Sequence, residues 1–114
     1  MSPDEIIAKS IQRTVHKKWV GFGGPFPIRF WLDLPKMEGI TSTAVLGALQ
    51  ERAQQAKERL DGGVASGVLK KVLVNEPDAR EAGGGNIHVE IDVFIVPFEG
   101  EQRKALDFVS EQGF

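Results

Sequence analysis

The sequence predicts an α+β domain in which helices pack mainly on one face of a mixed, three-stranded β-sheet. Two stretches alternate apolar and polar residues with the period of a strand, and a third short stretch is rich in valine and leucine. Three further segments have the apolar spacing of helices. A length of 114 residues with 41% hydrophobic and 26% charged residues suits a single domain over residues 1–114.

The most regular strand pattern runs through residues 87–96. One face of this strand is apolar and consists of Ile87, Val89, Ile91, Val93 and Ile95. The other face consists of His88, Glu90, Asp92, Phe94 and Val96. Such alternation is typical of a strand with one buried side. Glycines at 83–85 and Pro97 mark its two ends.

A second strand is expected over residues 28–34, which Pro35 ends. Its inward residues are Ile28, Phe30, Leu32 and Leu34, and its outward residues are Arg29, Trp31 and Asp33. Trp31 on the outward side indicates that this face is also partly covered, by the first helix or by another subunit. A third strand is expected over residues 67–74. The crossover rule predicts that it runs parallel to the second, with the last strand antiparallel to its neighbour.

The first helix is expected to begin after Ser2, which can cap it, and to end near Lys18. Its apolar stripe is Ile7, Ile11 and Val15. A basic cluster at its end, formed by Arg13, His16, Lys17 and Lys18, suits the negative end of the helix dipole. The alternative for this cluster is a phosphate or nucleic-acid contact.

Two further helices follow. The longest is expected to start at a cap among residues 41–43, to reach about Leu60 and to end at glycines 62–63. Its apolar face is narrow and comprises Val45, Leu49, Ala53, Ala56 and Leu60. The last helix is expected over residues 101–111, with Gly113 as a left-handed cap and Phe114 in contact with Val109.

Two loops invite a functional interpretation. Residues 19–27 combine aromatics, glycines and prolines, so Phe22 and Phe26 either tuck under the loop or serve as anchors for a partner. Residues 75–85 form a long, charged, glycine-rich loop, interpreted as an arm that orders on a partner or as a disordered excursion. Beside it, Lys70 or Lys71 is expected to face Glu90 or Asp92.

Composition bounds the partners. A net charge of −2 and a pI near 5.7 argue against wholesale binding of nucleic acid or of an anionic membrane. Without cysteine there is no disulfide framework, thiolate zinc site or thiol nucleophile. No stretch has the apolar length of a signal peptide core or of a membrane span, so we expect a soluble cytoplasmic protein.

The one compact set of acid, base and ligand residue types is His88, Glu90 and Asp92 on one strand face. Same-face neighbours lie about 7 Å apart and the outer two about 13 Å apart, so the three cannot hold one ion without other strands. A solvated face balanced by lysines is the simpler interpretation. We therefore expect neither a metal nor a cofactor.

Residues 42–97 carry a further pattern: Ala53, Ala56 and Lys57 on a helix, then the turn Gly67-Val68-Leu69, then the glycine-rich arm. In this order they resemble the small phage neck and tail-completion proteins, although the proline usual before that turn is missing. The resemblance implies a ring-forming subunit of a virion or of an assembly.

These observations favour a non-catalytic assembly or interaction subunit that works in a homo-oligomer or with other protein subunits. Its expected interface residues are Trp31, Phe94, Val96, Phe22 and Phe26. The alternative is a small enzyme or ligand-binding protein with a site at a dimer interface, formed by His88, Glu90, Asp92 and Arg29. A third interpretation, nucleic-acid binding through Lys9, Arg13, Lys17 and Lys18, predicts affinity that falls steeply with salt.

Overall fold

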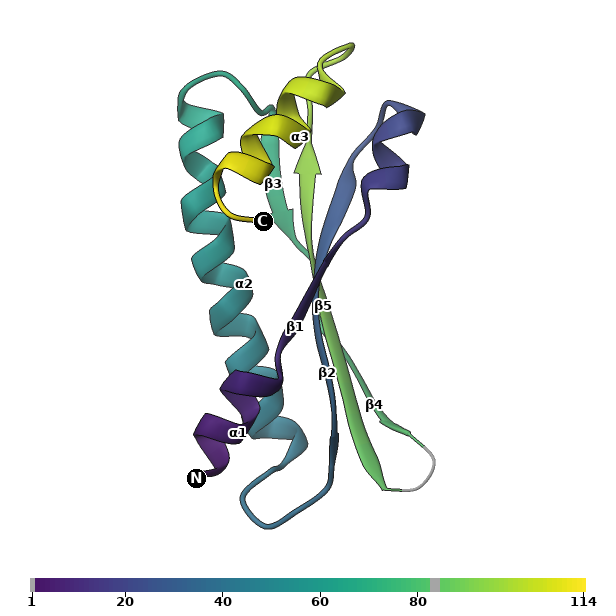
Figure 1. Cartoon of the computed structure of the whole chain (residues 1–114), viewed down its shortest axis with the longest axis vertical. Coiled ribbons are helices and arrows are strands. Elements are labelled where there is room, and N and C mark those ends of the chain that lie inside the picture. Colours follow the sequence, from purple (N-terminus) through teal and green to yellow (C-terminus); the bar gives the residue numbers. More distant parts are fainter. Residues whose placement is uncertain (1, 83–84) are drawn as a thin grey trace.

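Strand β5 (Asn86–Val96) is the centre of the sheet and pairs with strands on both of its sides (Figure 1). On one side lies β2 (Phe26–Pro35), which in turn pairs with β1 (Gln12–Val15). On the other side β3 (Lys71–Val74) pairs with one half of β5 and β4 (Asp78–Ala82) with the other half. The described strands therefore form an open, five-stranded sheet in which every pairing is antiparallel.

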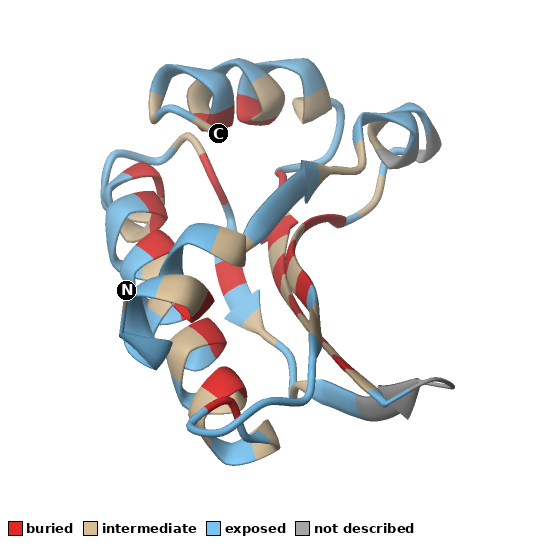
Figure 2. Cartoon of the chain, turned by 60° about the horizontal axis from the view of Figure 1, so that its bottom comes forward, coloured by how far each residue is buried: buried red, intermediate tan, exposed pale blue. Residues whose placement is uncertain are grey.

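The computed structural model describes residues 2–82 and 85–114, and among these all side chains except those of residues 19, 22 and 80–82. The helical elements are α1 (Pro3–Ser10), the 3-10 helix η1 (Lys17–Phe22), α2 (Ser42–Ala65) and α3 (Gln102–Glu111). Helix α2 lies along one face of the sheet and contacts β5, β3 and β2. Helix α1 packs on α2, and α3 lies across one end of the molecule against η1 (Figures 1 and 2).

The core lies between α2 and the sheet. Every apolar residue predicted to face inward on β5 is buried, from Ile87 to Ile95. From β2 come Phe26, Ile28, Phe30 and Leu32, and from α2 come Val45, Leu49, Ala53, Ala56 and Leu60, all of them buried. Figure 2 shows these buried positions on the surfaces that α2 and the sheet turn toward each other. Removal of this apolar surface from water is the main driving force for the layered arrangement.

The helix ends follow local rules. Ser2 accepts a hydrogen bond from the backbone N–H of Glu5 at 3.3 Å, and Thr41 caps α2 by accepting from Ala44 at 3.1 Å. Gly113 has a φ of +90°, and the next N–H, of Phe114, donates to the carbonyl of Val109. The predicted N-terminal caps and the predicted left-handed C-terminal cap are thus confirmed.

The prediction of a mixed, three-stranded sheet is wrong in its details, although the α+β class is confirmed. Strands β2 and β3, expected to be the parallel strands of a mixed sheet, are not neighbours because β5 lies between them and is antiparallel to both. They still point in the same direction, as the crossover rule required. The extra strands are β1 and β4.

The first helix is shorter than predicted. It ends at Ser10, whose hydroxyl donates to the carbonyl of Ile6, and the chain then becomes strand β1. The stripe that continued through Ile11 and Val15 is therefore not a helix face. Because Arg13, Lys17 and Lys18 lie beyond the helix, the helix dipole does not account for the basic cluster, and that interpretation is corrected.

Helix α2 is longer than predicted and continues through the glycine pair to Ala65. Gly63 is buried, and a Cβ atom built on it would lie 2.5 Å from a ring carbon of Phe108 on α3 and 3.0 Å from Leu69. This glycine therefore permits close packing of α3 on α2 rather than ending the helix. The chain turns instead at Gly67, which has a φ of +80°.

Much of the predicted loop over residues 75–85 is strand β4, which pairs with β5 from Asp78↔Glu90 to Ala82↔Asn86. Residues 83 and 84 of that predicted arm lie outside the described residues. Lys71 is opposite Val96, so the expected pairing of a lysine with Glu90 or Asp92 is also wrong.

The molecule is elongated, with extents of 48 × 24 × 19 Å. Among residues 2–82 and 85–114, no helix has both the length and the apolar character needed to cross a bilayer.

Candidate functional site

The face of the sheet that points away from α2, here called the outer sheet face, carries most of the residues that the sequence singled out. Its members include Thr14 on β1, Pro27, Arg29, Trp31 and Asp33 on β2, Leu73 on β3, and Asn86, His88, Glu90, Asp92, Phe94 and Val96 on β5. None of the described helices α1, α2 and α3 lies over this face (Figure 2). Helix α2 covers the opposite face, while His16 and Lys18 at the start of η1 lie beside Arg29, Asp92 and Phe94 on the outer sheet face. The rest of this face is left to solvent or to another molecule.

One end of the outer sheet face is apolar. Phe94 lies between Pro27 on β2 and Leu73 on β3, and Val96 is the next outward residue on β5. Leu73 is 46% exposed, while Phe94 and Val96 are partly exposed. This cluster is a continuous apolar surface, since the residues on adjacent strands are direct cross-strand neighbours.

Trp31 lies further along the same face and is held by its polar edge. Its Nε1–H donates to the Oγ1 of Thr14 at 3.2 Å, and its ring lies 6.2 Å from that of His88, tilted by 31°. The indole hydrogen bond is thus satisfied within the chain, so the partly exposed ring can be covered without loss of a hydrogen bond to water.

Between the two apolar regions the charged side chains form a connected series, here called the polar ladder. Arg29 donates to both carboxylate oxygens of Asp92, from Nε at 2.9 Å and from Nη2 at 3.1 Å, and its Nη1 lies 3.7 Å from Glu90. The hydrogen bond to Asp92 raises the pKa of Arg29. Burial lowers this pKa, whereas the negative charges of Asp92, Glu90 and Asp78 raise it further. This bidentate pair ties β2 to β5 across the face.

The ladder continues through His88. Its Nε2 lies 3.3 Å from the carboxylate of Glu90 and its Nδ1 lies 3.4 Å from the carboxylate of Asp33. Asp33 also accepts a hydrogen bond from the side chain of Asn86 at 2.9 Å. Both ring nitrogens of His88 are therefore directed at carboxylates that belong to the chain itself.

A hollow of about 260 Å³ opens beside the ladder, lined by Thr14, His16, Arg29, Trp31, His88 and Glu90. The Nε2 atom of His16 is shielded from solvent and makes no hydrogen bond within the described part of the chain. General acid–base catalysis needs a nitrogen or oxygen directed at the substrate, whereas both nitrogens of His88 are directed at carboxylates. In the described ranges no group of three or more His, Asp or Glu residues has the geometry to hold a metal ion.

The structure sorts the predicted interface residues into three groups. Trp31, Phe94 and Val96 share the outer sheet face, but Trp31 lies about 13 Å along the sheet from Phe94, beyond the rung formed by Arg29. Phe26 is 0% exposed and belongs to the core, so its assignment as a surface anchor is corrected. The side chain of Phe22 lies outside the described residues.

The residues of this face that sequence reasoning missed are Thr14, Leu73 and Asn86. Thr14 was missed because the apolar stripe Ile7-Ile11-Val15 predicted a helix through the residues that form β1. Leu73 lies in a run of valine and leucine, where no alternation of polar and apolar residues shows which side chain faces outward.

Comparison of the chain with protein-family models, with curated protein sequences and with solved structures gave no match.

Proposed function

We propose that the chain is a non-catalytic assembly or interaction subunit that works as part of an oligomer, with the outer sheet face as its contact surface. The observation that carries this proposal is the one-sided layer: α2 covers one face of the sheet, while the other presents Trp31, Phe94, Val96 and the exposed Leu73. Apolar side chains grouped on an otherwise uncovered sheet face are typical of surfaces that meet another molecule.

The polar ladder supports the same proposal. Covering a charged group is costly when it has no partner, but Arg29, Asp92, Glu90 and His88 already have partners within the chain. These internal contacts lower the cost of covering the ladder, although Arg29 is shared by two carboxylates and the ladder keeps a net negative charge. The apolar end is therefore the part of the face that provides the favourable free energy of contact.

The occupant we propose is a second copy of this chain. Two copies related by a twofold axis would present the same apolar end and the same internally paired ladder to each other, which needs no separate complementary surface. The cytoplasm is the setting that we propose for this assembly.

A role as a neck or tail-type virion component is the narrower form of the proposal and depends on the resemblance of residues 42–97. Two features of that stretch agree with it, since Ala53 and Ala56 face the sheet from α2 and Gly67 makes the turn that follows. The glycine-rich arm over residues 75–85 departs from the resemblance, because β4 forms part of this segment.

The alternative, a ligand site at His88 and Glu90, is less well supported. Its hollow is shallow and its histidine is engaged on both sides by Glu90 and Asp33. A substrate would first have to displace one of these contacts.

The proposal is tested with two matched substitutions. Leu73 on the outer sheet face and Met37 in the turn between β2 and α2 are 46% and 45% exposed, so each tolerates a polar side chain equally well in a single copy. We expect Leu73→Asp to weaken self-association at least about tenfold, because an unpaired carboxylate would be buried in the contact. Sedimentation velocity at matched concentrations measures the effect.

Met37→Asp is the control and should leave the association constant unchanged. If Met37→Asp and Leu73→Asp weaken self-association equally, the contact is not specific to the outer sheet face. If neither changes it, the proposed surface is wrong.

A further inference from the structure

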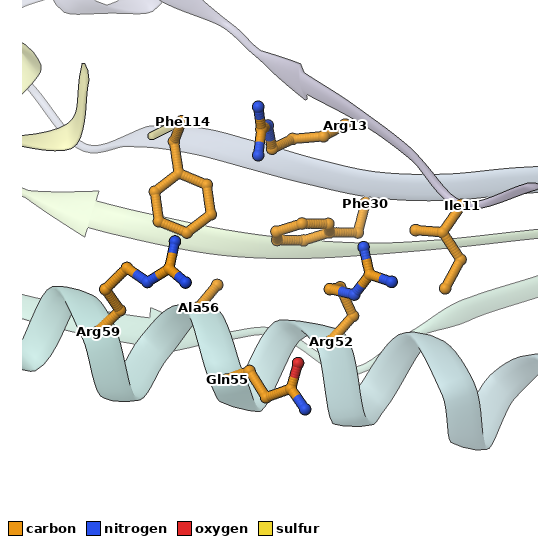
Figure 3. A pocket seen from close by; sticks show the side chains of 8 residues that line it. All are labelled: Ile11, Arg13, Phe30, Arg52, Gln55, Ala56, Arg59 and Phe114. Carbon is orange, nitrogen blue, oxygen red and sulfur yellow. The ribbon is translucent and has the colours of Figure 1, made fainter. Parts of the chain in front are cut away.

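On the opposite side of the sheet, a cavity of about 510 Å³ lies between α2 and strands β1 and β2. It is lined by Ile11, Arg13, Phe30, Arg52, Gln55, Ala56, Arg59 and Phe114 (Figure 3). The volume is in the range of sites for small organic ligands. Arg13 and Arg59 are exposed, so the cavity is open to solvent at its rim.

Three guanidinium groups meet at this cavity. Arg52 and Arg59 project from α2 toward the sheet, two helical turns apart, and Arg13 enters from β1 on the other side (Figure 3). No Asp or Glu side chain lines the cavity, and the acidic group that its lining residues carry is the α-carboxylate of Phe114, the last residue of the sequence. Since the whole chain has a net charge of −2, this concentration of positive charge is a local feature of the fold.

Part of the cluster has a structural role. The guanidinium carbons of Arg13 and Arg59 lie 5.2 and 5.5 Å from the ring centre of Phe114, and Arg59 Nη1 donates to the carbonyl of Gln112 at 3.0 Å. These contacts hold the turn after α3 against α2. Arg52 takes no part in them, and it makes no hydrogen bond or ion pair with the described residues. The contacts with Phe114 and Gln112 therefore do not account for the presence of Arg52 in the cavity.

The floor of the cavity is apolar. Phe30 meets Phe114 edge to face, with ring centres 6.4 Å apart and planes at 85°, and Ile11 and Ala56 complete the surface. Phe30 and Ala56 are buried, so the apolar surface open to a ligand is that of the partly exposed Phe114 and Ile11. The site therefore combines cations at its rim with a small apolar surface, which suits a ligand with a charged head and a small apolar body.

A smaller hollow of about 210 Å³ continues the cavity along α2 toward α1, and it shares Ile11, Arg52 and Gln55. This hollow includes the carboxylate of Glu51. An anionic group is therefore favoured at the end of the cavity near Arg59 and Arg13, on the side of Arg52 that is away from Glu51.

We propose that this cavity binds a small organic phosphate, with the phosphate held by Arg52 together with Arg13 or Arg59 and the apolar part lying against Phe114 and Ile11. A guanidinium binds phosphate through parallel hydrogen bonds. A phosphate monoester carries close to two negative charges and several acceptor oxygens, which matches several guanidiniums better than a single carboxylate does. The proposal is independent of the assembly function, because it uses the other side of the sheet.

The experiment is a calorimetric titration of the whole chain with phenyl phosphate, pyrophosphate and benzoate. Phenyl phosphate has an aromatic ring and a phosphate group, pyrophosphate has phosphate groups without a ring, and benzoate has a ring with a single carboxylate. We expect phenyl phosphate to bind most tightly and benzoate to bind at least about tenfold more weakly, since it has fewer charge-assisted hydrogen bonds to make. Absence of heat with both phosphate probes at millimolar concentrations would overturn the proposal.

Arg52→Gln should weaken binding of phenyl phosphate on the order of tenfold to a hundredfold, and Arg13→Gln, at an exposed position, provides a second test that does not depend on α2 packing. The control is Arg103→Gln, which removes the same charge from a residue on α3 that lines neither hollow. Equal weakening in all three variants would show binding through net charge alone, and the proposed site would then be rejected.

Discussion

At the scale of residues, Arg29 organises the outer sheet face. Its guanidinium accounts for the pairing of two of the carboxylates on β5, and through Glu90 it is connected to His88 and Asp33. The side chain is 35% exposed, so water weakens its ion pairs without removing them. The ladder therefore contributes modestly to stability, and its larger effect is to give each of these polar side chains a partner on the face.

We expect Arg29→Met to lower the free energy of unfolding by about 1 kcal/mol, near the low end for charge-assisted hydrogen bonds because the site is partly solvated. Asp92 would then lose its ion-pair partner, and Glu90 would keep only its contact with His88. Urea denaturation at fixed protein concentration measures the change. Arg103→Met serves as the control, since Arg103 forms an exposed pair within one helix and should have little effect. A loss of the same size in both variants would contradict the assigned role of Arg29.

The outward position of Arg29 and of Asp92 could be predicted from alternation alone, but their pairing could not. A period of two leaves any even shift of one strand against the other equally acceptable. The partners are 63 residues apart in the chain, and the register Arg29↔Asp92 is set by the packing of β2 on β5. Without that register, Lys70 or Lys71 was expected to be the cross-strand partner of Glu90 or Asp92.

At the scale of elements, the strong patterns led to correct predictions and the weak ones did not. β5 and α2 have long, regular apolar faces, and both formed as expected. β1 was missed because its apolar residues continue the spacing of α1, and tertiary pairing with β2 decided its conformation. β4 has the sequence Asp-Ala-Arg-Glu-Ala, which has low β-propensity. It forms where β3, which pairs with residues 93–96 of β5, leaves residues 86–90 without a partner on that side.

The glycine pair in α2 gives a test at this scale. A Cβ atom at Gly62 would meet nothing within 4 Å, whereas one at Gly63 would collide with Phe108 and Leu69. We expect Gly62→Ala to stabilise the protein by about 0.5–1 kcal/mol through helix propensity. Gly63→Ala should be less stable than Gly62→Ala by about 1–3 kcal/mol, because Leu69 is fully buried and cannot move freely.

Thermal or urea unfolding of the two alanine variants measures this difference directly. Each variant is the other's control, since the residues are adjacent in the same helix and the substitution is identical. If Gly63→Ala stabilised the protein as much as Gly62→Ala, the close packing of α3 on α2 through Gly63 would be wrong.

At the scale of the whole molecule, the account rests on the asymmetry of the two sheet faces. The sequence led to this conclusion through the number of strands, and that reason needs correction, since the described sheet has five strands rather than three. The asymmetry persists because α1, α2 and α3 do not cover the outer sheet face. Trp31, Phe94 and Val96 accordingly remain partly exposed in a single copy.

The most direct test is the mass of the unmodified protein in solution, measured by light scattering across a dilution series. A chain of 12.5 kDa that associates through its outer sheet face should have at least twice that mass at high concentration and should dissociate on dilution. A constant mass of 12.5 kDa at every concentration would contradict self-association through this face.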